Sequence, residues 1–399
     1  MDVLLVGSDN PLGAALRGVL AQWGRHRAAE LTVAGSRWRS ERQAKKAVRK
    51  GRSDAVVDCR LAWQIAAGDV PTAADIERGH WLAKACERRG MRYILLSCDR
   101  VFSGLTDGRL RESDPADASA APGVQMLELE SRVAQAAPSA LVLRTGPLFA
   151  GVGRNLLTQT LERMDLAATR ASQPDDLSPP RAEPPGSPNA AHRAAEPPSR
   201  RAVEFDNRDV FCPVCSVDAA RVIAAILDQL SVGARARGIY HYGSCDRATA
   251  YDFAEAALAA ARPWLNSGRS PYAAPAPEPA RSLSRAQSPG AGAVANGSTA
   301  GLNSPQPELA EVSPKAAIRV LDCSRLRNTF AVKQESWRHF VDAVVQQYYG
   351  AARSPEPARG PVAGANGSTA RPSPPQTDGL NSPQTEPAEA SAAKGVRRV

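Results

Sequence analysis

Aromatic residues are scarce in this 399-residue chain, at 5% of the total, and they are unevenly placed. Residues 170–201, 266–315 and 351–399 together hold 24 of the 32 prolines but one of the 20 aromatic side chains. Segments without large apolar side chains cannot bury enough surface to offset the entropy of ordering the chain. We therefore expect two disordered insertions, at 170–201 and 266–315, and a disordered tail at 351–399. The remainder is expected to fold.

Long apolar runs and paired cysteines are also lacking. No run approaches the roughly 20 residues that a membrane-spanning helix needs, and the first residues do not form a signal peptide. The seven cysteines are odd in number and scattered, which favours reduced thiols and a cytoplasmic protein. Residues 212–215 (CPVC) form a lone CxxC pair, and a zinc site needs two more ligands. His241 and Cys245 are only loose candidates, so no metal is predicted.

The net charge is +9, and basic residues concentrate between Arg37 and Arg52. Such a run is compatible with anionic ligands. We interpret most of it as the solvated face of a helix. The chain has no known nucleic-acid-binding motif, so no nucleic-acid partner is predicted.

Two short sequences recur in the proline-rich stretches. ANGSTA occurs at 295–300 and 365–370, and GLNSPQ at 301–306 and 379–384. These low-complexity copies carry no apolar pattern that could stack as a structural repeat. Expansion of a tolerant linker is the preferred interpretation, and docking of a partner through them is the alternative.

Apolar runs alternate with helical patterns along the first half of the chain. Strands are predicted at 2–7, 30–34, 54–59, 92–97 and 140–145, and helices at 14–23, 38–51, 73–89 and 127–137. Strands that alternate with helices indicate a parallel sheet covered on both faces. In the second half we expect helices at 216–230, 249–262 and 335–349 and a strand at 238–242.

The first predicted strand leads into a glycine-containing turn, residues 7–13 (GSDNPLG). Gly7 and Gly13 would let the backbone approach a diphosphate at the start of the following helix. Asn10 is suited to cap that helix and Pro11 to its first position. Asn10 also replaces the middle glycine of the usual GxxGxxG turn. The pattern predicts a dinucleotide-type phosphate loop that includes Leu12.

The segment after the second predicted strand indicates which cofactor the loop would take. Sites that prefer NAD place an Asp or Glu there to hold the ribose hydroxyls. This chain has Arg37 and Arg39 instead and no carboxylate. The candidate cofactor is therefore NADP(H), whose 2′-phosphate suits arginine. The alternative is that both arginines face water.

Several ordered motifs resemble the extended short-chain dehydrogenase/reductases, specifically the dTDP-4-dehydrorhamnose reductase branch. Residues 97–104 (SCDRVFSG) are similar to its S-T-D-Y-V-F-x-G motif, and residues 54–59 (DAVVDC) to its D-V-V-V-N-x strand. Residues 112–115, 144–155, 213–220 and 238–241 follow later motifs of the family in the same order. That branch also contains the non-catalytic beta subunit of methionine adenosyltransferase.

The resemblance implies an α/β fold, a Rossmann-like doubly wound parallel sheet with a smaller C-terminal substrate-binding subdomain. Residues 1–169 would form the NAD(P)-binding domain, and 202–265 with 316–350 the C-terminal elements that pack on it. It also assigns site residues. The cofactor would contact Gly7, Asn10, Pro11, Leu12, Gly13, Arg37, Arg39, Asp58, Cys59 and Ser97, and a sugar-nucleotide substrate would contact Asp99, Arg100, Val101, Phe102 and Asn155.

The catalytic residues that the resemblance implies are missing. Reductases of this family use a Thr or Ser, a Tyr and a Lys, the last two in a Tyr-x-x-x-Lys pair. Ungapped counts from the flanking motifs place Pro122 and Met126 at the pair and Cys98 at the hydroxyl. None of the seven lysines follows a tyrosine by four residues. Proline and methionine cannot donate a proton, so we expect a catalytically degenerate site.

Three functions remain open from the sequence. The first is a binding or regulatory protein that holds NADP or a sugar nucleotide and docks on a partner enzyme. The second is a working NADPH-dependent reductase of dTDP-4-dehydro-6-deoxy-L-mannose with an unusual proton donor. The third is an interaction protein that binds no nucleotide.

Overall fold

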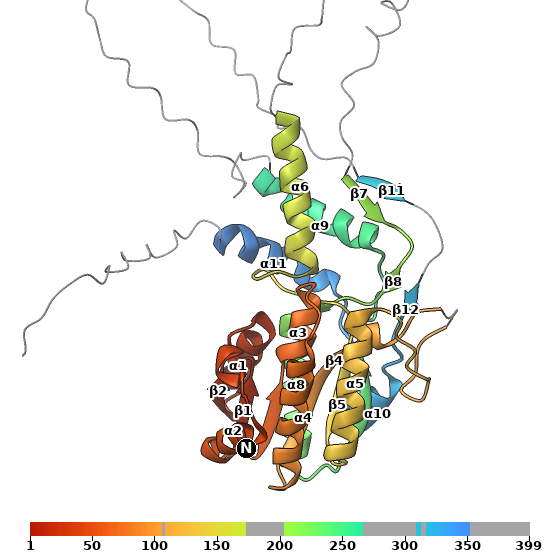
Figure 1. The fold of residues 1–399 in the computed structure, drawn as a ribbon. Coiled ribbons are helices and arrows are strands. Elements are labelled where there is room, and N and C mark those ends of the chain that lie inside the picture. Colours follow the sequence, from red (N-terminus) through yellow and green to blue (C-terminus); the bar gives the residue numbers. More distant parts are fainter. Residues whose placement is uncertain (106–107, 173–202, 266–308, 313–316, 352–399) are drawn as a thin grey trace, which may run out of the picture. The chain divides into compact units, whose positions relative to one another are not determined.

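The computed structural model describes residues 1–105, 108–172, 203–265, 309–312 and 317–351 (Figure 1). All of them belong to one compact unit, Met1–Ser354. The predicted tail after residue 351, and most of the two predicted insertions, lie outside the described residues.

A six-stranded parallel sheet forms the centre of this unit. The strands lie in the order β10-β5-β4-β3-β1-β2. Their bounds are Asp2–Val6 for β1, Arg27–Leu31 for β2, Ala55–Asp58 for β3, Arg92–Cys98 for β4, Leu141–Thr145 for β5 and Gly238–Tyr242 for β10. Runs such as DVLLV and LVLRT are mostly apolar, and all of their residues except Asp2 are buried, because both faces of a parallel sheet are covered.

Helices cover both faces of the sheet (Figure 1). On one face α1 (Pro11–Trp23) and α8 (Ser216–Ser231) pack around Leu16, Val222 and neighbouring apolar side chains. On the other face lie α2 (Glu41–Gly51), α4 (Ala73–Glu87) and α5 (Ala121–Ala136). This three-layer arrangement confirms the predicted Rossmann-like, doubly wound α/β fold.

The strand order reverses between β1 and β3, because the chain runs from β1 outward to β2 and then returns to β3. The loops that follow β1 and β3 therefore leave in opposite directions at the carboxyl edge of the sheet. Ligands of doubly wound folds bind at this switch point. The predicted phosphate loop and residues 58–59 both lie there.

A third apolar cluster lies beyond that edge, around Phe149, Phe253 and Trp337. It draws on α6, α9 and α11 and on short strands that pair two by two in parallel. The further elements are α3 (Arg60–Ala66), β6 (Leu148–Phe149), α6 (Leu156–Ser172), β7 (Val203–Asp206), β8 (Val210–Phe211), β9 (Val214–Cys215), α9 (Ala250–Leu265), β11 (Leu309–Val312), β12 (Ile318–Arg319), α10 (Ser324–Phe330), α11 (Arg338–Ala351) and the 3-10 turns η1 (Ala34–Ser36) and η2 (Asp99–Val101).

Most predicted elements are found within a few residues, and the exceptions have physical causes. The strand expected at 30–34 is Arg27–Leu31, because an edge strand tolerates the polar residues that precede the apolar ones. Helix α5 starts six residues early, since Pro122 is tolerated in a first turn. Helices α3 and α6 were not predicted, and α6 runs to Ser172 inside the first predicted insertion. The second predicted insertion contains a strand, β11, which pairs with β7.

Membrane-spanning helices and cysteine pairing can be checked within the described residues. No helix within the described ranges is long and apolar enough to cross a membrane. All seven cysteines lie in these ranges, and each is a free thiol.

Candidate functional site

The predicted phosphate loop joins β1 to α1 and is held from two sides. The Asn10 side chain accepts a hydrogen bond from the Gly13 amide at 2.8 Å, which is the predicted helix cap. Its amide group also donates to the Cys59 carbonyl at 3.0 Å, at the end of β3. A Cβ on Gly13 would lie 2.2 Å from the Gly7 carbonyl oxygen. The loop therefore requires glycine at position 13. The Asn10 side chain links the loop to the backbone at the end of β3.

One polar atom in the loop has no partner. The Ser8 hydroxyl is buried and makes no hydrogen bond with any described residue. The neighbouring Asp9 carboxylate accepts from the Val33 amide at 2.7 Å, which fixes the loop against the end of β2. A buried hydroxyl left open at a helix start fits a phosphate oxygen.

A buried ion pair lies beside this loop. Arg60 binds the Asp58 carboxylate in a bidentate manner, with nitrogen–oxygen distances of 2.6 and 2.8 Å, and its guanidinium lies over the Trp38 ring. The Tyr93 hydroxyl donates to the same carboxylate at 3.1 Å. Asp58 and Arg60 are both buried, and Arg60 also borders Gly7. Asp58, a predicted cofactor residue, is thus engaged inside the protein. Cys59 is buried as well.

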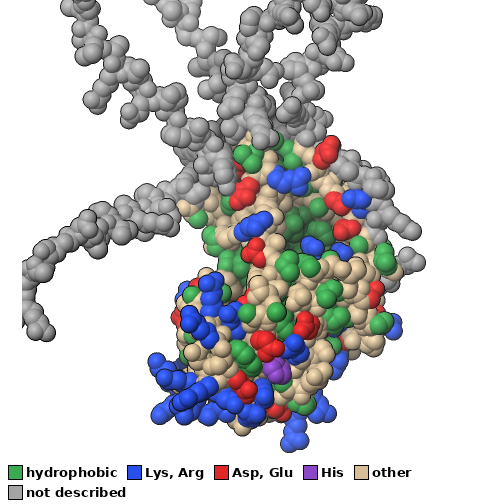
Figure 2. All heavy atoms as spheres, viewed as in Figure 1, with side chains coloured by type: hydrophobic (Ala, Val, Ile, Leu, Met, Phe, Trp, Pro, Cys, Tyr) green, Lys and Arg blue, Asp and Glu red, His purple; other side chains and the backbone are tan. Residues whose placement is uncertain are grey.

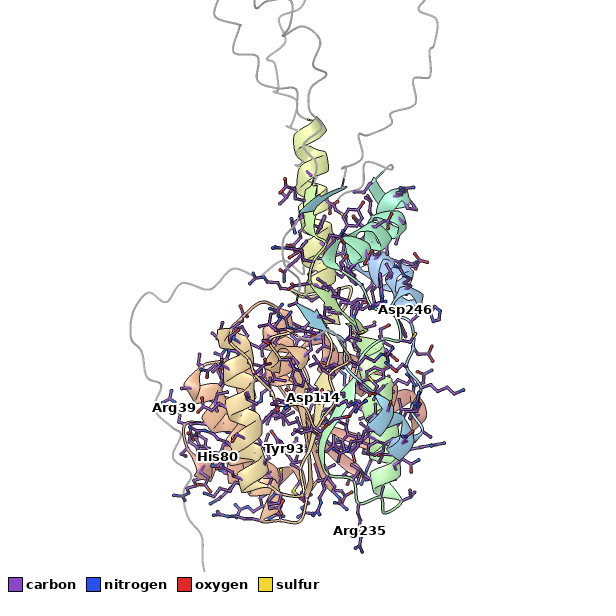
Figure 3. The ribbon with its side chains drawn as sticks, turned by 90° about the vertical axis from the view of Figure 1, so that its right-hand side faces the viewer. Arg39, His80, Tyr93, Asp114, Arg235 and Asp246 are labelled. Carbon is purple, nitrogen blue, oxygen red and sulfur yellow. The ribbon has the colours of Figure 1, made fainter. Side chains whose placement is uncertain are left out.

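Arg37 and Arg39 follow η1 and are both exposed, whereas Trp38 between them is buried. Figure 3 shows Arg39 at the surface and Tyr93 inside the domain. The structure gives neither arginine side chain an acidic partner among the described residues. Two exposed guanidinium groups beside the end of β2 fit the 2′-phosphate of NADP.

A second buried ion pair lies at the end of β4. Arg144 on β5 binds Glu130 on α5, with a shortest nitrogen–oxygen distance of 2.6 Å, and both side chains are buried. The Ser97 hydroxyl donates to the same carboxylate. Ser97, predicted to contact the cofactor, is therefore committed to a partner in the core. Sequence reasoning missed Glu130, although an isolated glutamate on the buried face of a helix is a signal for such a pair.

The residues at the expected catalytic positions surround the first turn of α5. Pro122 is in that turn, and Met126 is completely buried in the cluster that includes Val101 and Phe102. Burial raises the pKa of the Cys98 thiol to about 12. None of these three groups offers an acidic proton at neutral pH.

The predicted substrate residues are mostly buried. Asp99, Val101 and Phe102 lie in the interior, and Arg100 is exposed. Asn155 is also buried, and its amide group is bonded to backbone atoms of residues 150–158. Asn155 therefore stabilises the turn before α6. This structural role is enough to explain an asparagine at this position, whether or not a substrate binds.

His241, on β10, faces the same region. Its Nδ1 donates to the Leu110 carbonyl at 3.1 Å, and its ring packs edge-on against Phe102. Burial first, and then the nearby Arg144 charge, lower the pKa of His241 to about 4. The ring is neutral at physiological pH and is held as part of the fold.

A pocket of about 400 Å³ lies next to these residues and was not predicted. Arg109, Arg247, Cys212 and Cys245 line it, together with residues of β12 and the segment after β10. Asp99 lies close enough to contribute to the raised pKa of Cys212, after the larger effect of burial. Two arginines beside this pocket suit an anionic ligand, such as the diphosphate of a sugar nucleotide.

Asp99 provides a test of the electrostatics at this site. Burial raises the pKa of its carboxyl group to about 6, although Arg100 and Arg319 oppose the shift. The native state therefore binds the proton more tightly than the unfolded chain, whose carboxyl pKa is about 3.9. The free energy of unfolding should fall as the pH rises from about 4 to about 6.

We expect Asp99→Asn to be about 3 kcal/mol more stable than the parent at pH 7.5 and equal to it at pH 4. Urea denaturation at both values measures the difference, and titration of His241 cancels because both proteins contain it. An unchanged difference at the two pH values would contradict the assigned pKa.

The hydrogen-bond donors and cations of the site determine which ligands it can bind. The phosphate loop, the open Ser8 hydroxyl and the two exposed arginines fit a phosphorylated dinucleotide. No group of three or more His, Cys, Asp or Glu side chains suited to a metal occurs in the described part of the chain, which includes the CxxC pair at 212–215.

Comparison with known proteins shows which proteins this chain is similar to. Residues 1–173 match the RmlD substrate binding domain. A dTDP-4-dehydrorhamnose reductase of Mycobacterium tuberculosis (strain CDC 1551 / Oshkosh) is 28% identical over 184 residues, which are 44% of this chain and 59% of that relative. The chain thus matches less than two thirds of the relative's length.

Solved structures with the same fold have lower identity. A dTDP-4-dehydrorhamnose reductase from Clostridium acetobutylicum superposes with a TM-score of 0.57 at 16% identity, covering 87% of this chain and 99% of its own. A Bacillus anthracis dTDP-4-dehydrorhamnose reductase in complex with NADP gives 0.56 at 13% identity, covering 86% and 98%. Residues 1–173 are thus similar to the RmlD substrate binding domain, and the described residues share the fold of these dTDP-4-dehydrorhamnose reductases.

Proposed function

We propose that this protein is an NADP- and sugar-nucleotide-binding relative of the dTDP-4-dehydrorhamnose reductases that has lost reductase chemistry. The observation that carries the proposal is the first turn of α5. Ungapped counts from the flanking motifs put Pro122 and Met126 at the positions of the family's proton-donating tyrosine and its lysine, and Met126 is fully buried. General acid catalysis contributes roughly 10²–10⁴-fold to a rate, and its loss leaves binding without efficient turnover.

The binding part of the proposal rests on the loop and the arginines. The Gly7–Gly13 turn and the Ser8 hydroxyl would hold the diphosphate, and Arg37 with Arg39 the 2′-phosphate. NADPH supplies a hydride when bound. The pocket beside Arg109 and Arg247 would hold the diphosphate of a sugar nucleotide. A protein of this kind would act in the cytoplasm as a binding or regulatory subunit of a partner enzyme.

Titration with NADPH tests the binding part. The free energy of unfolding is expected to rise as RT ln(1 + [L]/Kd), by about 2.7 kcal/mol at one hundred times Kd. NADH should stabilise the protein less. In the control variant Arg37→Gln/Arg39→Gln the difference between NADPH and NADH should disappear. An unchanged thermal transition with both nucleotides would support the interaction-protein alternative instead.

A turnover assay tests the catalytic part. NADPH oxidation with dTDP-4-dehydro-6-deoxy-L-mannose is expected to be at least about 100-fold slower than with an active family member. Turnover comparable to the active enzyme would refute the loss of chemistry. It would establish the alternative of a working reductase with a different proton donor.

A further inference from the structure

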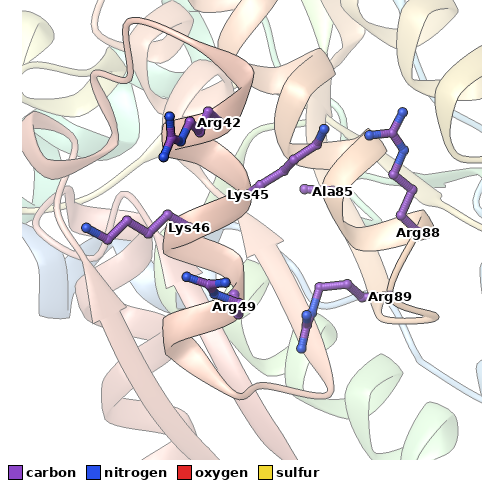
Figure 4. Close-up of a pocket in the computed structure, with 7 residues that line it drawn as sticks. All are labelled: Arg42, Lys45, Lys46, Arg49, Ala85, Arg88 and Arg89. Atoms are coloured by element: carbon purple, nitrogen blue, oxygen red, sulfur yellow. The ribbon is translucent and has the colours of Figure 1, made fainter.

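A basic groove lies between two helices on the outer layer of the sheet domain. Its volume is about 460 Å³. Figure 2 shows Lys and Arg side chains gathered over the part of the molecule that contains α2 in Figure 1. Apart from Ala85, every residue that lines the groove is a cation, namely Arg42, Lys45, Lys46, Arg49, Arg88 and Arg89 (Figure 4).

These cations greatly exceed the acidic groups near them. Glu41 is the one carboxylate among the described residues that forms an ion pair with a cation lining the groove, and it is shared by Lys45, Lys84 and Arg88. The other four cations lining the groove form no ion pair with any described residue: Arg42, Lys46, Arg49 and Arg89. A concave surface with such an excess of one charge focuses the potential and attracts anions.

Stabilisation of helix ends does not account for this arrangement. Cations near the C-terminal end of a helix interact favourably with its dipole. Arg49 lies in the last turn of α2, and Arg88 is the C-cap residue of α4. That effect needs one or two cations at each end and does not require them to face one another. Here Lys45 and Arg49 stand on one side of the groove and Arg88 and Arg89 on the other (Figure 4).

We propose that this groove is a binding site for a small ligand that carries several linked phosphates, separate from the dinucleotide site. The phosphate loop does not line the groove, and neither does Arg37 or Arg39. The proposal therefore stands whether or not NADP binds.

The side chains that line the groove indicate which chemical class of ligand it would bind. Arginine forks bind phosphate oxygens in pairs, and four of the six cations are arginines. The volume is that of a small-molecule site. No aromatic side chain lines the groove, so it lacks the stacking surface that single-stranded nucleic acid uses. It also lacks the apolar centre of a protein interface. Linked phosphates bring several negative charges into one compact ligand.

Calorimetric titration with inorganic tripolyphosphate tests the site, with the full chain at about 0.15 M salt so that distant charges are screened. Arg49→Gln/Arg89→Gln is expected to weaken binding at least tenfold, roughly the loss of two charge-assisted contacts. Both side chains are exposed, so the variant should fold. Arg235→Gln/Arg237→Gln is the matched control. It removes the same charge from the exposed lower end of the ribbon in Figure 3, where Arg235 is labelled, and should bind like the parent.

Two further arms locate and identify the ligand. Arg37→Gln/Arg39→Gln should retain full tripolyphosphate binding, which separates the groove from the dinucleotide site. A glutamate peptide of equal charge should bind at least tenfold more weakly than tripolyphosphate. The proposal is overturned by any of three results. These are no binding of tripolyphosphate, equal weakening of its binding by the Arg49→Gln/Arg89→Gln and Arg235→Gln/Arg237→Gln variants, or binding of the glutamate peptide at least as tight as that of tripolyphosphate.

Discussion

Replacing Arg60 with alanine is expected to lower the free energy of unfolding by about 3–5 kcal/mol, because the substitution leaves the Asp58 carboxylate buried without a counter-ion. Asp58 is completely buried, and Arg60 supplies two of its hydrogen bonds. The Tyr93 hydroxyl and the backbone amide of residue 60 still donate to the carboxylate in the variant, but neither carries a charge. Chemical denaturation of the parent and the variant measures the loss.

The double variant Asp58→Asn/Arg60→Ala is the control for this prediction. A neutral amide still accepts the Tyr93 hydrogen bond and needs no counter-ion. The double variant should therefore be clearly more stable than Arg60→Ala alone. Equal losses in both would mean that the missing packing of Arg60 against Trp38 and Gly7 causes the effect, and the uncompensated charge does not.

Gly123→Ala should destabilise the protein by about 3 kcal/mol, although alanine is worth up to about 1 kcal/mol over glycine inside a helix. A Cβ at Gly123 would lie 1.9 Å from the backbone carbonyl oxygen of Arg100. Neither backbone can yield without moving α5 away from η2, which carries Asp99. The first turn of the helix and the end of β4 would separate.

Gly18→Ala is the matched substitution. Gly18 lies in α1, is exposed, and has no atom within 4 Å of the added Cβ. This variant is expected to gain up to about 1 kcal/mol in the free energy of unfolding. Thermal or urea unfolding of both variants provides the test. A gain in both would contradict the close approach of α5 to Arg100.

The parts of the fold that follow from local chemistry were predictable from the sequence. Continuous apolar runs gave five of the six strands of the sheet, and the Asn10 cap with Pro11 gave the start of α1. Strand β2 was displaced because an edge strand does not need an apolar face on both sides. The start of α5 was missed because Pro122 and Gly123 together resemble a turn, and only the carbonyl of Arg100 explains the glycine.

The site was less predictable, because burial decides what a polar side chain does. Ser97 and Asn155 were assigned to ligands from family motifs, yet both are hydrogen-bonded to protein atoms. Nothing in their neighbouring residues indicates this. Arg109 and Arg247 meet at one pocket from segments far apart in the chain, so no spacing could reveal them. The basic run on α2 was visible in the sequence. The other side of the basic groove, Arg88 and Arg89, could not be predicted because it depends on how α4 packs beside α2.

The pairing of β7 with β11 bears on how freely insertions and deletions can be accepted in the segments that precede these strands. Helices α6 and α9 both pack against β7, so the chain leaves and re-enters the described fold within one small region at its upper end in Figure 1. The entropy of closing a loop grows slowly, by about 0.6 kcal/mol for each doubling of its length. Evolution can therefore lengthen or shorten the two long connections there at little thermodynamic cost, while the six-stranded sheet keeps its shape.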